Sequence, residues 1–142
     1  MGSSGRPEAT AGTGRALRVL LCDDSAELRA LLRSAIEEGR GDVEIVGEVG
    51  DGDAGLRLAA EHQPDVVVVD LEMPGPAPAT LLRTLRRLAP RAAIVTFSGH
   101  DPAVVAGPAA REIALHLPKT TDLAAAGSAV RELGRRRRAA RS

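Results

Sequence analysis

Aromatic residues are nearly absent from this chain. Phe97 is the only one among 142 residues, and there is no Trp or Tyr. Sites that hold bases or sugar rings by stacking need aromatic side chains, so we expect no such site here. Because 44% of the residues are hydrophobic, the chain should still fold around an aliphatic core, and its length suits one domain.

Cysteine and long apolar runs are scarce as well. Cys22 is the only cysteine, which excludes an internal disulfide and a thiolate zinc site and agrees with a reducing compartment. No apolar stretch approaches the roughly 20 residues that a membrane-spanning helix needs. The amino end lacks the apolar segment of a signal peptide. We therefore expect a cytoplasmic protein with no membrane attachment.

The charged residues are unevenly distributed. Residues 17–133 carry 18 acidic and 12 basic residues, whereas 134–142 carry five Arg and no acid. Residues 1–15 are rich in Gly, Ser, Thr and Ala and have little to bury, which predicts a disordered leader. We expect one folded domain over 16–133 and a basic tail over 134–142. Without aromatic residues, such a tail would bind nucleic acid only weakly and nonspecifically. The alternative is the solvated end of the last helix, where cations suit the helix dipole.

Strand and helix patterns alternate along the chain. Val66 to Val69 are four consecutive β-branched residues, which predicts a strand buried on both faces, as in a parallel sheet. Pro108 interrupts the fourth helical segment and predicts a short or kinked helix there. The expected strands are 17–22, 43–49, 66–69, 92–97 and 113–117. The expected helices are about 25–38, 52–62, 79–88, a segment beginning near 101, and about 121–137.

Five β/α units predict an α/β fold, a flavodoxin-like doubly wound (βα)5 three-layer sandwich. The expected order of its parallel strands is 2-1-3-4-5, which makes the first and third strands neighbours. Asp23 and Asp24 follow the first strand and Asp70 follows the third, so these acids should converge at one edge of the sheet.

Three converging carboxylates repel one another unless a cation neutralises them. A ligand set made only of oxygen favours Mg²⁺ over Zn²⁺, and Mg²⁺ also binds phosphates. A metal ion there would draw a phosphoryl group towards Asp70, whose carboxylate would act as the nucleophile.

Two polar residues follow the remaining strands. Lys119 is the only lysine beside 18 Arg, and a lysine ammonium is a compact charge suited to one phosphate oxygen. Ser98 follows the fourth strand and would supply a hydroxyl. Thr96 lies two positions earlier and is the alternative hydroxyl residue.

Together these motifs resemble the receiver domain of two-component response regulators, over roughly residues 17–133. Residues 46–75 resemble the subgroup that often precedes a helix-turn-helix DNA-binding domain. The matching motifs are Asp23-Asp24, the run from Val66 through Asp70 to Gly75, Ser98-Gly99, and Leu117-Pro118-Lys119.

The resemblance implies that Asp70 accepts a phosphoryl group from a histidine kinase or a phosphotransfer protein. It implies that Ser98 and Lys119 each bind a phosphoryl oxygen. Ser98 would also act as a switch with His116, which stands where the family usually has an aromatic residue. The implied ligands of Mg²⁺ are Asp23, Asp24, Asp70 and the backbone carbonyl of Glu72.

The resemblance also implies that the protein is not an enzyme, because it would assist only its own phosphorylation and dephosphorylation. A homodimer is a further possibility. DNA contact would come only through an output domain outside this chain or, weakly, through the basic tail. The main alternative is a receiver-like interaction module that works without phosphorylation, suggested by His116 and Pro108. A weaker alternative is a phosphatase with Asp70 as nucleophile and Glu72 as acid/base.

Overall fold

The structure is a computed structural model that describes residues 15–39 and 41–141. The expected leader lies outside these residues, apart from Arg15. Five parallel strands form one sheet in the order β2-β1-β3-β4-β5, which confirms the predicted topology. The strands are β1 (Leu17–Cys22), β2 (Val43–Val49), β3 (Val66–Val69), β4 (Ala93–Ser98) and β5 (Ile113–Pro118).

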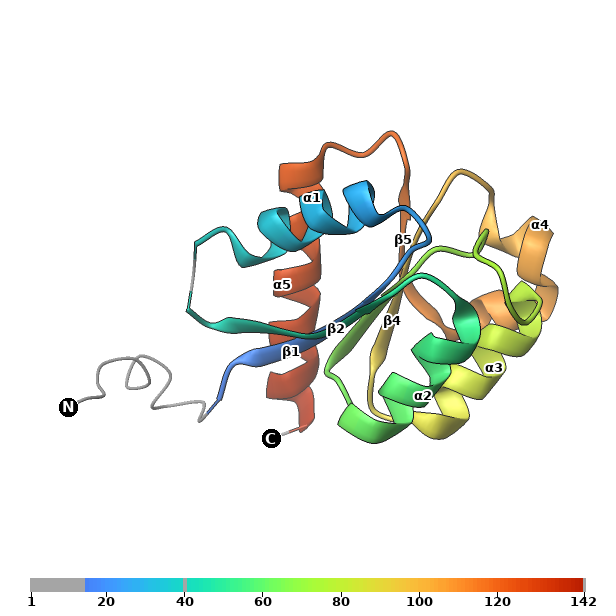
Figure 1. Ribbon diagram of the computed structural model, residues 1–142. Helices are drawn as coiled ribbons and strands as arrows, with labels where there is room; N and C mark the ends of the chain where they lie inside the picture. Colours follow the sequence, from blue (N-terminus) through green and yellow to red (C-terminus); the bar gives the residue numbers. More distant parts are fainter. Residues whose placement is uncertain (1–14, 40, 142) are drawn as a thin grey trace.

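Helices cover both faces of the sheet (Figure 1). One face carries α1 and α5, and the other carries α2, α3 and α4. The bounds are α1 (Ala26–Glu37), α2 (Gly52–His62), α3 (Pro78–Leu88), α4 (Pro102–Ala106), the 3₁₀ helix η2 (Gly107–Glu112) and α5 (Leu123–Arg141). Among the described residues, none of these helices is long and apolar enough to cross a membrane.

The core lies in two layers, one on each side of the sheet. Val66 and Val68 of β3 pack into the layer beneath α1 and α5. Val67 and Val69 pack into the layer beneath α2 and α3. All four side chains are buried, as expected for a strand whose side chains alternate between two covered faces.

The first helix begins directly behind the acidic pair. Ser25 has extended backbone angles, and its side chain accepts a hydrogen bond from the backbone N–H of Leu28 at 3.1 Å. This N-cap satisfies one of the free N–H groups at the start of α1. Because β1 ends at Cys22, Asp23 and Asp24 form the whole link between strand and cap.

The fourth helix is short, as Pro108 predicts. It ends at Ala106, and Gly107 takes a positive φ of 57° before the chain continues as a 3₁₀ helix. Proline has no N–H to continue the α-helical ladder, so the chain changes helix type there. The last helix continues to Arg141, so the basic residues from Arg135 onward belong to α5.

Candidate functional site

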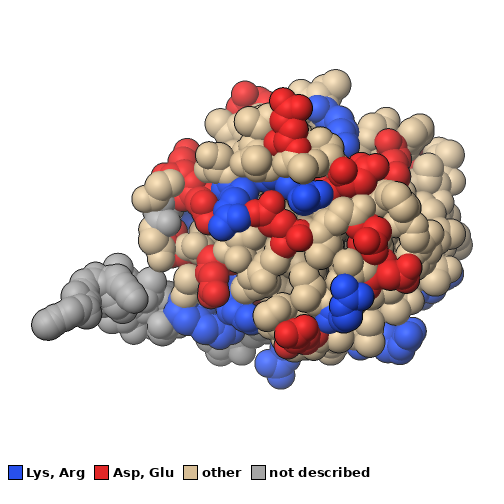
Figure 2. Space-filling view, viewed as in Figure 1, with Lys and Arg blue, Asp and Glu red and all other residues tan. Residues whose placement is uncertain are grey.

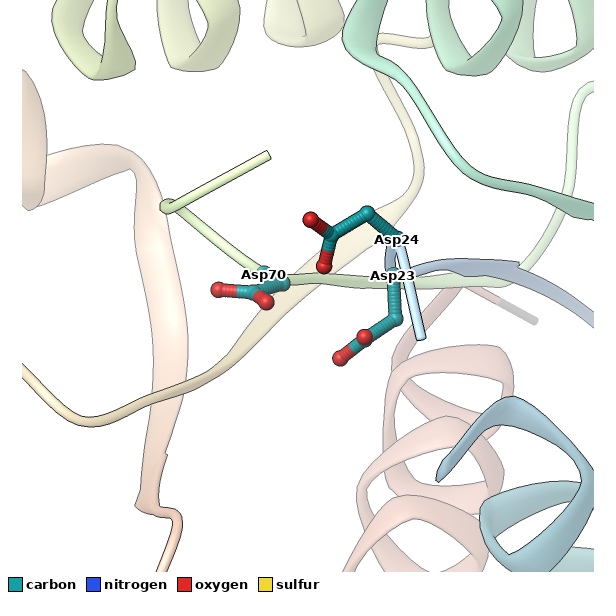
Figure 3. Close-up of side chains that lie close together, drawn as sticks. All are labelled: Asp23, Asp24 and Asp70. Atoms are coloured by element: carbon teal, nitrogen blue, oxygen red, sulfur yellow. The ribbon is translucent and has the colours of Figure 1, made fainter. Parts of the chain in front are cut away.

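Three carboxylates meet at the carboxyl edge of the sheet (Figure 3). Asp23 and Asp24 follow β1, and Asp70 follows β3, whose last residue pairs with the last residue of β1. One carboxylate oxygen from each residue lies within 4.8 Å of the other two. Asp23 and Asp70 are buried, whereas Asp24 is exposed. The cluster is therefore set into the protein and opens towards solvent on the Asp24 side.

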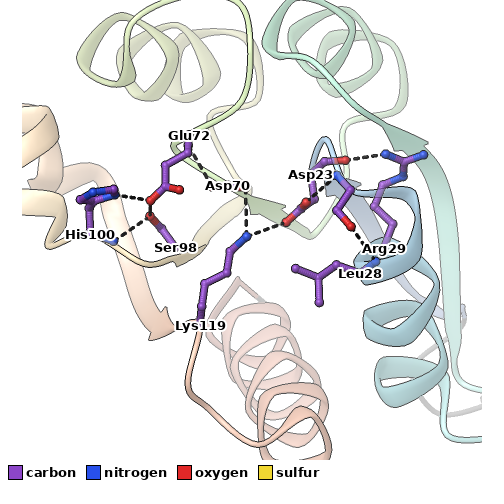
Figure 4. A network of polar contacts seen from close by, with 9 residues as sticks. Asp23, Leu28, Arg29, Asp70, Glu72, Ser98, His100 and Lys119 are labelled. Atoms are coloured by element: carbon purple, nitrogen blue, oxygen red, sulfur yellow. Dashed lines mark hydrogen bonds and ion pairs between the residues drawn. The ribbon is translucent and has the colours of Figure 1, made fainter.

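Lys119 points into this cluster from the loop after β5 (Figure 4). Its Nζ atom lies 3.1 Å from Oδ2 of Asp70 and 3.5 Å from Oδ2 of Asp23. Burial lowers the pKa of Lys119, but its contacts with Asp70 and Asp23 outweigh this effect and leave the pKa raised. The side chain is therefore an ammonium at neutral pH.

The Asp70 carboxylate is held by two donors. Its Oδ1 accepts a hydrogen bond from the backbone N–H of Glu72 at 2.9 Å, and its Oδ2 faces Lys119. Burial raises the pKa of Asp70 and nearby Asp23 raises it further, whereas the Glu72 N–H and Lys119 lower it; the net shift is upward. The cluster thus has more negative charge than the single ammonium balances.

The donor set of this cluster fits a hard divalent cation. All the converging side-chain atoms are carboxylate oxygens, and Mg²⁺ and Ca²⁺ prefer oxygen ligands. A cation would also offset the repulsion between Asp23 and Asp70, which adds to the effect of burial in raising the pKa of Asp70. The backbone of Glu72, two residues beyond Asp70, lies at the same edge through its hydrogen bond to that carboxylate.

The hydroxyl of Ser98 is engaged by the side chain of Glu72. Ser98 Oγ donates to Glu72 Oε2 at 3.2 Å and accepts from the backbone N–H of His100, also at 3.2 Å. The ring of His100 contacts the same carboxylate oxygen (Figure 4). The hydrogen bond from His100 is the main cause that lowers the pKa of Glu72. The sequence predicted the backbone of Glu72 as a metal ligand and its side chain only as the acid/base of a phosphatase, so this contact with Ser98 and His100 was missed.

Ser98 and His116, the two residues predicted to act as a switch, have different hydrogen-bond partners among the described residues. Nδ1 of His116 lies 2.8 Å from Oγ1 of Thr96. The strand register explains the difference, because Thr96 pairs with His116 across β4 and β5 while Ser98 pairs with Pro118. The switch role of Ser98 and His116 therefore stays a prediction, and the alternative hydroxyl residue, Thr96, is the hydrogen-bond partner of His116.

A cationic residue that sequence reasoning missed lies behind the acidic pair. Nη1 of Arg29 donates a hydrogen bond to the backbone carbonyl of Asp23. Helical side chains lean towards the amino end of their helix, so an arginine four residues after the cap Ser25 can reach back over the loop. That spacing is the signal in the sequence that could have identified it.

Curated relatives include proteins with two kinds of function. The chain is 44% identical over 82 residues to protein-glutamate methylesterase/protein-glutamine glutaminase 1 of Myxococcus xanthus, covering 58% of this chain and 24% of the relative. It is 48% identical over 59 residues to the transcriptional regulatory protein LiaR of Bacillus subtilis, covering 42% of this chain and 28% of the relative. The chain thus spans about a quarter of the length of these relatives.

The first of these relatives corrects one prediction. The resemblance led us to expect that the protein is not an enzyme, yet several relatives are named as methylesterases and glutaminases. The prediction is wrong because it was based only on residues that form the receiver-like fold and its site. Such residues carry no signal of the chemistry of another domain in the same protein, so they give no ground for excluding an enzyme.

Comparison with solved structures and with a family model agrees with the fold. The receiver domain of the response regulator NarL from Mycobacterium tuberculosis superposes with a TM-score of 0.74 at 29% identity, covering 85% of this chain and 98% of that one. The family model of the response regulator receiver domain matches residues 19–130, which include the acidic cluster and Lys119. The chain therefore belongs to the response regulator receiver domain family of two-component signalling.

Proposed function

We propose that Asp70 is the phosphoacceptor of this receiver domain and that its phosphorylation depends on Mg²⁺. The observation that carries the proposal is the position of the Asp70 carboxylate. The carboxylate is buried, and one of its oxygens lies within 4.8 Å of a carboxylate oxygen of Asp23 and of Asp24. Its Oδ2 lies 3.1 Å from Nζ of Lys119. An acid that only caps a helix or lies in a solvated loop would not need these neighbours.

The reaction is a transfer from a nitrogen to an oxygen. A carboxylate oxygen of Asp70 attacks the phosphorus of a phosphohistidine, forming an acyl phosphate while the P–N bond breaks. The donor imidazole leaves with the electron pair of that bond and takes up a proton. The N–H of Glu72 and the ammonium of Lys119 hold the two oxygens of Asp70, so the nucleophile is oriented in advance.

Four groups of this chain would hold the metal ion: the carboxylates of Asp23, Asp24 and Asp70 and the backbone carbonyl of Glu72. Bound Mg²⁺ supplies positive charge that neutralises the phosphoryl oxygens. Lys119 supplies a second positive charge beside Asp70, and its flexible ammonium suits a single phosphoryl oxygen.

The hydroxyl residues divide two tasks in this proposal. Ser98 borders the site and is the candidate hydrogen-bond donor to a phosphoryl oxygen, once its bond to Glu72 is released. Thr96 is the candidate link between the site and the surface at β5, because its hydroxyl contacts His116 on this edge strand. A movement of the Thr96 hydroxyl would therefore change the position of His116, which is partly exposed at the edge of the sheet.

The remaining parts of the proposal concern the setting of this site. We take residues 16–133 as the receiver domain and the phosphohistidine of a histidine kinase or phosphotransfer protein as the donor. A cytoplasmic location is consistent with the free, buried thiol of Cys22. Comparing the oligomeric state before and after phosphorylation tests for a phosphorylation-dependent homodimer.

The proposal is tested by incubating the chain with acetyl phosphate and measuring its intact mass. We expect a gain of one phosphoryl group with Mg²⁺ and none when the metal is chelated. The same gain in the chelated sample would contradict the dependence on Mg²⁺. No gain in either sample, together with no Mg²⁺ binding by calorimetry, would favour a phosphorylation-independent interaction module.

A further inference from the structure

The guanidinium of Arg29 lies where α1, the end of β1 and the end of β2 meet. Nη1 donates to the backbone carbonyl of Asp23, as Figure 4 shows, and Nε lies 3.7 Å from Oε1 of Glu48. Only 19% of the Arg29 side chain is exposed. The side chain therefore does not behave as a free surface charge.

The guanidinium lies beside a row of ion pairs between α1 and β2, and its buried Nε has no hydrogen-bond partner among the described residues. Glu48 also pairs with Arg33, one turn further along α1, and Arg33 pairs with Glu37. Figure 2 shows positive and negative side chains alternating between α1 and β2 on this face. A Cβ atom on Gly50 would lie only 3.3 Å from Nη1 of Arg29, so the absence of a side chain at this position leaves space for the guanidinium.

The loop that Arg29 contacts is the one that carries two of the three carboxylates. The backbone N–H of Asp23 donates to the carbonyl of Val49 at 3.0 Å. Oδ1 of Asp23 accepts from the backbone N–H of Ser25 at 2.9 Å. The bond from Arg29 satisfies the carbonyl of Asp23. Together these contacts fix both sides of the Asp23 peptide unit and its carboxylate.

We infer that Arg29 is a positioning residue for the metal site, acting through the Asp23 carbonyl to hold the carboxylates of Asp23 and Asp24 towards Asp70. The inference rests on the proposed function of this cluster and names a residue that sets its affinity for Mg²⁺. Groups that orient metal ligands typically change metal affinity 10- to 100-fold when they are removed.

The charge of Arg29 alone would have the opposite effect. A guanidinium bonded to the loop that carries Asp23 and Asp24 offsets part of the attraction of the acidic cluster for a divalent cation, so its removal should tighten Mg²⁺ binding if charge dominated. A residue that acts by positioning should weaken binding when it is replaced. The sign of the change therefore separates the two roles.

The test uses Arg29→Gln, with Arg33→Gln as the matched control. Both variants remove one arginine from α1 and one partner from Glu48, but Arg33 has no contact with Asp23 among the described residues. Calorimetry gives the Mg²⁺ affinity of each protein. Phosphorylation by acetyl phosphate over a series of Mg²⁺ concentrations gives the half-saturating concentration and the rate at saturation.

We expect Arg29→Gln to weaken Mg²⁺ binding by about 10-fold or more. The half-saturating Mg²⁺ concentration should rise equally, and the rate at saturating Mg²⁺ should stay within about twofold of wild type, since loss of affinity alone is restored by more metal. Arg33→Gln should leave the affinity within about twofold. Thermal unfolding without Mg²⁺ checks that both variants fold.

Unchanged or tighter binding in Arg29→Gln, or an equal loss in Arg33→Gln, would overturn the inference. If Arg29→Gln does not fold, Arg29→Lys replaces it, because one ammonium cannot bind the Asp23 carbonyl and Glu48 in the same way as the guanidinium. Unchanged or tighter Mg²⁺ binding in Arg29→Lys, or an equal loss in Arg33→Gln, would then overturn the inference. A wild-type protein that binds no Mg²⁺ would instead contradict the proposed metal site itself.

Discussion

Thr96 Oγ1 lies 2.8 Å from His116 Nδ1, across the neighbouring strands β4 and β5. Thr96 is fully buried, whereas His116 is half-buried on the edge strand. The hydrogen bond thus joins a residue beneath the acidic edge to a residue that reaches the surface. Ser98, two positions further on, makes its bond to Glu72 instead.

Replacing Thr96 by Val should lower the free energy of unfolding by about 1–2 kcal/mol, because His116 loses its partner while the strand keeps its shape. Ser98→Ala is the matched control and should cost less, since the partially exposed Glu72 can bind water instead. Urea unfolding measures both. Equal or larger destabilisation by Ser98→Ala would contradict the importance given to the Thr96–His116 bond.

Lys119→Gln should affect metal binding and phosphorylation in opposite directions. Removing the ammonium leaves the carboxylates of Asp23 and Asp70 with more uncompensated charge, so Mg²⁺ should bind about 3- to 10-fold more tightly. Phosphorylation by acetyl phosphate should slow by about 100-fold, the usual effect of losing one oriented charge at a reacting group. Calorimetry and the rate of mass gain measure the two effects, and weaker Mg²⁺ binding would contradict this electrostatic account.

Asp70→Asn should stabilise the protein without metal at neutral pH, because burial disfavours the ionised carboxylate in the folded state. Burial raises the pKa of Asp70 above its ordinary value of 3.8 in the folded state. The folded protein therefore binds this proton more tightly than the unfolded chain. The contribution to stability is present below pH 3.8 and is lost as the pH rises through the folded pKa.

The difference in stability between Asp70→Asn and wild type should accordingly grow as the pH rises from below 4 to 7. Chemical unfolding at several pH values, in the presence of a chelator, measures it. A difference that stays constant over this range, or one that favours wild type at pH 7, would contradict the effect of burial on Asp70.

Most of the fold could be predicted because its signals are local. The four valines before Asp70 indicate a strand covered on both faces, and the alternation of strands and helices gives the order of the sheet. Pro108 correctly indicates the short fourth helix. The ends of some elements differ from the prediction: the fourth strand was expected over 92–97 but β4 includes Ser98, and the last helix was expected from about 121 but α5 begins at Leu123.

The parts of the site that sequence reasoning missed depend on contacts between distant segments. Thr96 and Ser98 lie on the same side of β4, so periodicity could not decide which one meets His116. The register between β4 and β5 determines which residue faces His116. This register shifts between Ile94 and Val95, and nothing in the local sequence indicates the shift. The contact of Arg29 with Asp23 likewise depends on how α1 packs over the strand ends.

The measurement that tests the central claim most directly is the location of the phosphoryl group after transfer from a phosphorylated histidine kinase in Mg²⁺. Fragment mass spectrometry of wild type, Asp70→Asn and the control Asp101→Asn identifies the modified residue. Asp101 is a suitable control because it is an exposed helix cap that follows β4, at the same carboxyl edge of the sheet. We predict modification at Asp70 in wild type and in Asp101→Asn, and none in Asp70→Asn. A phosphoryl group on another residue, or undiminished transfer to Asp70→Asn, would contradict the assignment of Asp70 as the phosphoacceptor.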